Sequence, residues 1–256
     1  MINLPTYFLV GIIASLLGSM SGLGGGFLAI PSLYYLGVQL QYVVGTSKFM
    51  VFVNSVVSTY RYSRKMKLPI KLYVSVVVPM ILTAYLGAYL VVVLPSKILV
   101  LVIGVTLLAG SIRMIISTRG TPSTRDVKPT SNRMYVLGVF SGGIAGLVAG
   151  ISGLGGGIVN VPVFIYLLRL NPHLAVSLSM ASILPSALSS VIRHTIDNVI
   201  EWSIAIPLSI GAIIGGWIGP RIALGIKKET LRRIIGLVIA IATTRIIVEA
   251  VVELTS

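Results

Sequence analysis

The sequence consists mainly of apolar segments separated by short polar joints, and this pattern restricts the possible folds more than any other feature. A helix needs about 20 apolar residues to cross the ~30 Å hydrocarbon core of a bilayer, and most of these segments reach that length. Only 10% of the residues are charged. A soluble domain usually carries about a quarter charged residues to cover its water-facing surface. We therefore expect an all-α, polytopic membrane protein.

A duplicated motif divides the chain into two halves. Ser21-Gly22-Leu23-Gly24-Gly25-Gly26, followed by Pro31, recurs 131 residues later as Ser152-Gly153-Leu154-Gly155-Gly156-Gly157, followed by Pro162. Further residues keep nearly the same offset, in the pairs Pro79 and Pro207, Gly87 and Gly215, Gly104 and Gly236, and Arg113 and Arg245. Self-similarity over such a distance indicates a structural repeat. The sequence predicts an N-terminal repeat over 1–118, a basic linker over 119–131 and a C-terminal repeat over 132–256.

Each half contains five apolar segments in the same order. In the first half they run over about 4–20, 27–37, 43–60, 72–93 and 97–117, and in the second over about 134–151, 158–169, 173–193, 202–220 and 231–250. The second segment of each half is too short to cross the bilayer as a helix. Whether this short, glycine-adjacent segment crosses the bilayer or forms a re-entrant hairpin stays open at this point.

Basic residues are concentrated in three polar regions, which orient the two halves. Cytoplasmic loops carry an excess of Lys and Arg, so all three regions, including the linker, should face the cytoplasm. The second-half equivalent of the first region, over 193–201, is nearly neutral and should face outside. We therefore expect inverted repeats in the cell membrane, with both termini on the non-cytoplasmic side. The three regions hold 15 of the 20 basic residues: Arg61, Arg64, Lys65, Lys67 and Lys71; Arg113, Arg119, Arg125, Lys128 and Arg133; Arg221, Lys227, Lys228, Arg232 and Arg233.

Composition excludes several classes of function. The chain has no Cys, which excludes disulfides, thiolate metal sites and Fe–S clusters. Topology explains the net charge of +14, so we expect no nucleic-acid partner. The segments contain no pair of acids and no zinc-protease motif, so we expect no catalytic residue, no metal, no cofactor and no enzymatic activity. No carboxylate lies deep in a segment, which favours an anionic substrate over a cation.

The two glycine motifs are the strongest candidates for a substrate site. Inverted repeats with glycine-interrupted segments in matching positions are typical of a transporter's midplane site. The helix expected after each motif presents free N–H groups and the positive end of its dipole, which bind anions. The alternative is that these glycines only pack helices together; the six-residue identity in both halves favours a site. The candidate binding residues are Ser21, Gly22, Gly24, Gly25, Gly26, Ser152, Gly153, Gly155, Gly156 and Gly157.

Polar side chains on the third segment of each half extend the candidate site. Residues 47, 54 and 58 share one helix face, and so do 179, 182, 186 and 189; such a stripe can line a path or join helices by hydrogen bonds. A charge within an apolar segment, such as Lys48, predicts a functional role. The alternative is that Lys48 reaches the outer interface. We expect both histidines, His173 and His194, at an interface. The added candidates are Thr46, Ser47, Lys48, Ser177 and Asn160, the last opposite Ala29.

The doubled motif, the following Gly45-Thr46-Ser47 and the Pro79/Gly87 and Pro207/Gly215 pairs resemble the TauE/SafE family of membrane permeases, often called sulfite exporters. The resemblance covers essentially the whole chain. It implies a secondary transporter for a small sulfur-containing anion, such as sulfite or an organosulfonate, bound at the two motifs.

Two departures and several alternatives qualify this resemblance. Val176-Ser177-Leu178 replaces Gly-Thr-Ser in the second half, so the halves differ chemically. The lack of Cys argues against the permeases that pass sulfur between cysteines. A passive anion channel is the alternative function. The exact anion, the direction of transport and the coupling ion stay open, and small-residue faces serve internal packing or a homodimer equally well.

Overall fold

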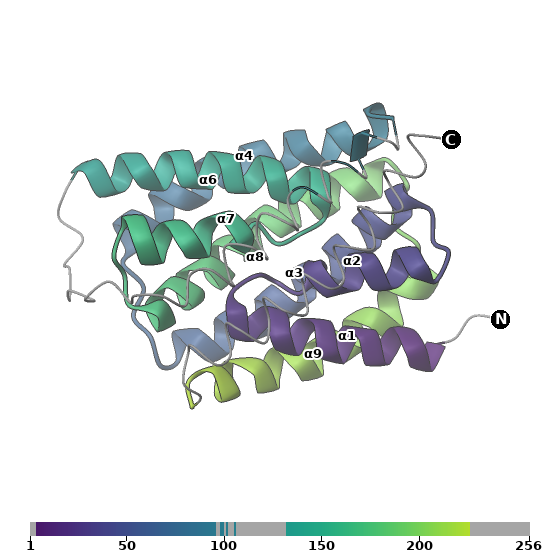
Figure 1. The fold of residues 1–256 in the computed structure, drawn as a ribbon, viewed down its shortest axis with the longest axis horizontal. Helices are drawn as coiled ribbons and strands as arrows, with labels where there is room; N and C mark the ends of the chain where they lie inside the picture. The colour runs from purple at the N-terminus through teal and green to yellow at the C-terminus, as the bar shows by residue number, and fades with distance from the viewer. Residues whose placement is uncertain (1–3, 96–97, 100, 102–104, 106–131, 226–256) are drawn as a thin grey trace.

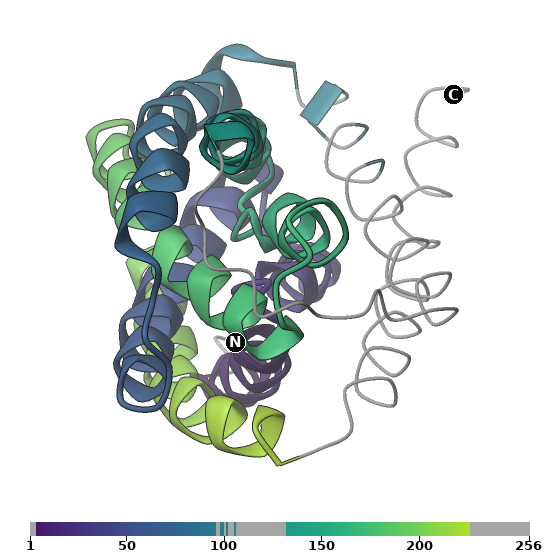
Figure 2. The same cartoon turned by 90° about the vertical axis from the view of Figure 1, so that its left-hand side faces the viewer.

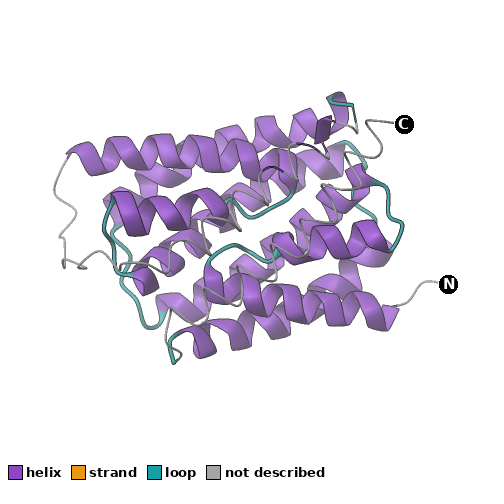
Figure 3. Ribbon diagram, in the orientation of Figure 1, coloured by secondary structure: helices purple, strands orange, loops and turns teal. Residues whose placement is uncertain are grey.

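The computed structural model describes residues 4–95, 98, 99, 101, 105 and 132–225, and these form helices joined by loops, without a strand among them (Figures 1 and 3). Six of the described helices are long and apolar enough to cross a membrane: α1, α3, α4, α6, α8 and α9. The bounds are α1 Leu4–Ser21, α2 Gly26–Tyr35, α3 Leu40–Ser63, α4 Ile70–Val93, α6 Asn132–Ser152, α7 Gly157–Pro162, α8 Pro172–Ile196 and α9 Trp202–Ala223, with a π-helical turn, η1, over Val163–Leu167.

The predicted all-helical membrane fold is confirmed. Four apolar segments of each half coincide with helices to within a few residues, and the short second segments are α2 and the α7–η1 pair. The fifth segments, 97–117 and 231–250, lie almost entirely outside the described residues, as does the linker over 119–131.

Helices of one half pack mainly against helices of the other. α1 lies along α9 and α4 along α6, and these two pairs form opposite edges of the bundle, with α3 and α8 between them (Figures 1 and 2). α1 and α6 hold equivalent positions in the repeat, and so do α4 and α9. The edge pairs touch backbone to backbone: a Cβ on Gly11 would collide with the Leu208 carbonyl, and one on Gly142 with the Val76 carbonyl. Each edge therefore requires small residues, as membrane helix pairs often do.

The helices run in opposite directions in the two halves. Figure 1 shows α1 and α6 antiparallel, and α3 and α8 antiparallel, while α2 and α7 run back toward the end of the bundle from which α1 and α6 respectively start. One end of the bundle thus holds the α3–α4 joint, the start of α6, the η1–α8 joint and the end of α9. The basic residues in these places are Arg61, Arg64, Lys65, Lys67, Lys71, Arg133, Arg169 and Arg221.

The side chains on the described surface suit contact with lipid along the sides of the bundle and with the membrane–water interface at its two ends. Large apolar side chains such as Leu82, Phe140 and Ile210 point outward from α4, α6 and α9. Aromatic rings mark both ends of α9, where Trp202 packs edge-on against Phe49 and Trp217 stacks on Tyr60. Tryptophan and tyrosine are enriched at the two membrane–water interfaces, which fits these positions.

Candidate functional site

The two glycine motifs meet in the buried centre of the bundle. A Cβ added to Gly26 would lie 2.7 Å from the Gly153 carbonyl oxygen, and one added to Gly24 would lie 3.2 Å from the Gly155 Cα. All residues of both motifs, 21–26 and 152–157, are buried. The loops therefore contact each other directly through their backbones, and a substrate can lie between them only if they move apart.

Each loop ends in a left-handed glycine that starts a short helix. Gly25, the N-cap of α2, has φ 96°, and Gly156, the N-cap of α7, has φ 78°. Only glycine adopts such angles readily, so the turn into each helix depends on it. The Gly25 carbonyl accepts hydrogen bonds from Leu28 and Ala29, and the Gly156 carbonyl accepts them in the same way from α7. The N–H groups of the first helical residues have no intrahelical acceptor, so two positive helix ends lie in the centre.

Lys48 on α3 reaches across to the second glycine loop. Its side chain is completely buried, and its Nζ donates to the Ala149 carbonyl oxygen at 2.8 Å and to the Leu154 carbonyl oxygen at 3.2 Å. The ammonium group thus binds the carbonyl end of α6 and the loop that follows it. It does not extend to the interface, and no carboxylate pairs with it in the described part of the chain.

Two side chains from the polar faces predicted on the third segments hold the first glycine loop, although neither is among the predicted binding residues. Ser179 on α8 donates to the Gly22 carbonyl oxygen at 2.7 Å, and Asn54 on α3 donates from Nδ2 to the Gly24 carbonyl oxygen at 2.8 Å. Ser179 follows Lys48 by 131 residues, so the repeat offset applied to Lys48 would have assigned it to the site. Asn54 lies on the predicted polar face with Ser47.

Several predicted binding residues already have hydrogen-bond partners within the protein. Ser21 and Ser152 donate back to carbonyls of their own helices. Thr46 accepts from the Glu201 N–H at 3.0 Å, toward the end of the bundle where α9 begins. Asn160 accepts from Ser141 at 2.7 Å, and its Nδ2 lies 3.4 Å from the Met80 sulfur.

Ser47 and Ser177 differ from these residues because their hydroxyls are buried without a hydrogen-bond partner among the described residues. An unsatisfied buried hydroxyl costs about 1–3 kcal/mol. A Cβ on Gly26 would lie 3.3 Å from the Ser47 Oγ, which places this hydroxyl beside the first residue of α2. Ser47 is therefore available to a ligand at that helix start. That these residues bind substrate stays a prediction.

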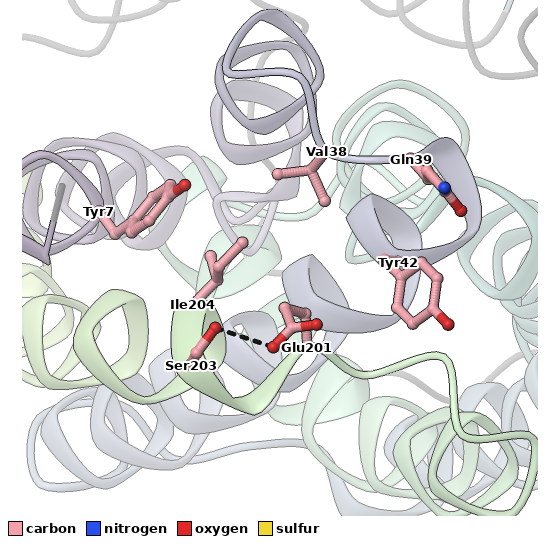
Figure 4. A pocket seen from close by; sticks show the side chains of 7 residues that line it. All are labelled: Tyr7, Val38, Gln39, Tyr42, Glu201, Ser203 and Ile204. Carbon is pink, nitrogen blue, oxygen red and sulfur yellow. Dashed lines mark hydrogen bonds between the residues drawn. The ribbon is translucent and has the colours of Figure 1, made fainter. Parts of the chain in front are cut away.

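A pocket of about 470 Å³ opens at the end of the bundle where α1 and α9 begin (Figure 4). Its one carboxylate, Glu201, accepts a hydrogen bond from Ser203 at 2.8 Å, and no described Lys or Arg lines it. No motif in the sequence indicated this pocket. Its lining residues are Tyr7, Val38, Gln39, Tyr42, Glu201, Ser203 and Ile204.

His194, expected at an interface, is instead completely buried near the end of α8, and neither ring nitrogen has a hydrogen-bond partner in the part of the chain that the structure describes. No sequence pattern indicated this burial, because a histidine near the end of a span usually lies in the headgroup region.

Comparison with known proteins places the chain in a family. A probable membrane transporter protein of Methanocaldococcus jannaschii is 29% identical over 247 residues, covering 90% of each chain. A probable membrane transporter protein of Bacillus subtilis is 25% identical over 263 residues, covering 94% of this chain and 96% of its own length. No solved structure matches significantly. The family model described as Sulfite exporter TauE/SafE matches residues 7–246, and the chain therefore belongs to the TauE/SafE family.

Proposed function

We propose that this membrane transporter is a secondary transporter for a small anion, with sulfur-containing anions such as sulfite or an organosulfonate as the substrate class. Its relatives are named as membrane transporters rather than enzymes, and its family is described as a sulfite exporter. The observation that carries the choice of an anion is the buried ammonium of Lys48, which among the described residues has carbonyl oxygens but no carboxylate as partners.

Electrostatics favour an anion in this centre. A buried charge without a counter-ion costs several kcal/mol, since carbonyl dipoles replace only part of its hydration. The two helix starts at Gly26 and Gly157 add positive potential to the same centre. An anion among these three groups would compensate the ammonium and accept hydrogen bonds from the free N–H groups. The Ser47 hydroxyl would add one more contact beside α2.

The contact between the loops supports alternating access. The centre is closed in this structure, so the substrate must be admitted by movement of the two loops relative to each other. Opposite helix directions in the two repeats, 1–118 and 132–256, support inverted halves that rock around a fixed site. The basic residues at one end of the bundle support a cytoplasmic orientation of that end. In this proposal the start of α1 and the pocket at Glu201 lie on the non-cytoplasmic side, and α1–α2 and α6–α7 form re-entrant hairpins.

A passive anion channel is the second candidate function, because the same charged centre attracts anions in both cases. Counterflow in proteoliposomes distinguishes them: a carrier loaded with unlabelled anion accelerates uptake of labelled anion, and a channel does not. We expect acceleration, because the loops close the centre.

The first test combines a ligand screen with one substitution. Purified protein is heated with sulfite, sulfate, thiosulfate, sulfoacetate, chloride or a carboxylate, and the melting temperature is compared with that of the free protein. Stabilisation by a sulfur oxyanion is expected, since a ligand that binds only the folded state raises its stability. Ser47→Ala should reduce the affinity for this anion at least about five-fold, which corresponds to ~1 kcal/mol of binding free energy. The melting temperature of the variant should therefore rise less when the anion is added.

Ser47→Ala is informative because the hydroxyl has no hydrogen-bond partner among the described residues that the substitution could remove. The variant should unfold at the same or a higher temperature than the wild type, so a loss of anion binding cannot be attributed to misfolding. Ser209→Ala is the matched control, since Ser209 on α9 is also buried and unpartnered. If no anion stabilises folded wild-type protein, or if both variants bind equally well, the proposed anion site is wrong.

A further inference from the structure

A buried polar stripe runs along α8 from the glycine loops to His194. Ser179, Ser182, Ser186, Ser190 and His194 follow each other at intervals of three or four residues, and all are completely buried. Ser179 binds the first glycine loop, and Ser190 donates to the Ala84 carbonyl oxygen on α4. Each of these serines donates a hydrogen bond to a carbonyl oxygen. Neither nitrogen of the His194 ring has a hydrogen-bond partner among the described residues.

The charged groups around His194 are few. Among the described residues, Lys48 on α3 and Arg193 on α8 are the charges that act electrostatically on its ring. Arg193 is itself paired with Asp197 and lies over the Tyr89 ring of α4 at 4.7 Å. The acid at the start of α9, Glu201, lines the pocket, and no charged side chain is described on α7.

The remaining described charges on the elements that pack against α8 lie at the opposite end of the bundle. They are Arg61 on α3, Lys71 on α4 and Arg133 on α6. Since no described acid pairs with His194, a proton on its ring would add a second positive charge to a region that already holds Lys48. Like charges repel strongly in the low dielectric of a protein interior.

We propose that His194 is the proton-binding group that couples anion movement to proton movement in this transporter. The inference rests on the proposed function and concerns the coupling ion of the same site. An anion bound near Lys48 offsets the repulsion, so anion binding favours proton binding at His194, and the reverse must hold by linkage. The imidazole takes a proton from water on one side of the membrane and returns it to water on the other, so one N–H bond forms and then breaks.

The fold offers His194 a connection to the outside. The His194 carbonyl oxygen accepts a hydrogen bond from the Val199 N–H at 3.1 Å, within the short joint that ends at Glu201 in the pocket wall. The backbone of His194 and the pocket wall are therefore attached to the same five-residue joint, 197–201. In this proposal, a movement of the joint relative to the end of α8 admits water to the ring from the pocket side without unfolding α8.

The test measures proton and anion movement separately in the same proteoliposomes. A trapped pH dye reports protons during uptake of the sulfur oxyanion selected by the thermal screen, and labelled-anion counterflow reports exchange at equal pH. We expect wild-type protein to move protons with the anion, and His194→Gln to reduce anion-driven proton movement at least ten-fold while keeping counterflow. His173→Gln, which alters the partly exposed histidine at the other end of α8, should behave like wild type.

A second variant guards against a folding defect. His194→Leu, which is close to histidine in volume, removes two ring nitrogens that have no hydrogen-bond partner among the described residues, so it should unfold at the same or a higher temperature and still lack proton coupling. Proton movement that persists in both variants, or wild-type anion flux without protons, would overturn the role of His194 and leave the anion transporter standing. Absence of counterflow in folded wild-type protein would instead overturn the proposed function and this inference together.

Discussion

The two halves build the centre of the molecule from similar backbone elements but with different side chains. In each half a loop with the same six residues precedes a short helix, and a long helix passes beside both loops. At equivalent positions α3 carries Lys48 and Asn54, whereas α8 carries Ser179 and Pro185. Lys48 and Ser179 both donate to a carbonyl of the opposite loop, but to carbonyls that are not equivalent in the repeat, Leu154 and Gly22, so a charge makes this contact on one side and a hydroxyl on the other.

The duplicated elements have two roles: they form the contact between the halves, and they set the charge of the centre. The glycines determine the backbone contact between the halves, and the repeat preserves them on both sides. The side chains of α3 and α8 determine the charge of the centre, and here the halves diverge. We infer that the fold depends on the symmetric part and that anion binding depends on the asymmetric part.

The largest loss of stability is expected from a substitution where the backbones of the two glycine loops are closest. In Gly157→Ala the new methyl would collide with the Gly22 carbonyl oxygen and lie 2.7 Å from the Leu23 Cα, and neither atom belongs to a flexible side chain. Overpacking of this kind costs about 1–3 kcal/mol or more. We expect little folded protein, measured as the monodisperse yield in detergent and the melting temperature.

Gly26→Ala tests whether the contact is equally tight from the other half. Its methyl would meet the Gly153 carbonyl oxygen at 2.7 Å, a less severe overlap, so its melting temperature should lie between those of wild type and Gly157→Ala. Gly143→Ala on α6 is the control, since nothing lies within 4 Å of its Cβ and alanine favours a helix. Equal stability of all three variants would contradict a backbone contact between the loops.

Lys48→Met removes the charge that only one half contributes to the centre, and it should reduce transport more than stability. It removes two hydrogen bonds to carbonyls, each worth about 1.5–3 kcal/mol when the donor is charged, but also relieves a buried charge that costs several kcal/mol. The melting temperature should therefore change little, while anion uptake into proteoliposomes falls at least about ten-fold, or 1.4 kcal/mol.

Lys71→Met provides the control for Lys48→Met. Lys71 is an exposed lysine at the start of α4, outside the centre, and its loss should leave the uptake rate unchanged. If Lys48→Met transports anions as fast as Lys71→Met, the ammonium group has no role in attracting the substrate.

The sequence was enough to predict the parts of the molecule that depend on the length of apolar segments and on the internal repeat. Apolar segments predicted the described helices, and the doubled motif predicted that two matching loops exist. It did not reveal that the loops touch each other, because that contact depends on the packing of α1 on α9 and of α4 on α6. It also left the direction of individual side chains open: Lys48 points to the second loop rather than the interface, and Thr46 points to Glu201.

The burial of His194 and the pocket at Glu201 were beyond the sequence for the same reason. Both involve the joint between α8 and α9 and its contacts with residues more than a hundred positions away, such as Thr46. No periodicity connects these positions. Only the repeat offset, which relates Lys48 to Ser179, carried long-range information, and it applies only where the halves are alike.

The smallest effects are expected from the neutral hydrogen bonds that hold the first loop. Asn54→Ala removes the donor to the Gly24 carbonyl oxygen and leaves Ser58 without its Asn54 acceptor, so it should cost about 1–3 kcal/mol of unfolding free energy. Ser179→Ala removes one neutral bond, to Gly22, and should cost about 0.5–1.5 kcal/mol. Thermal unfolding of both variants and the double variant measures these costs. Because both side chains hold the same loop, the loss of unfolding free energy in the double variant should differ from the sum of the two single losses. Strict additivity would mean that the two carbonyls of the loop are held independently of each other.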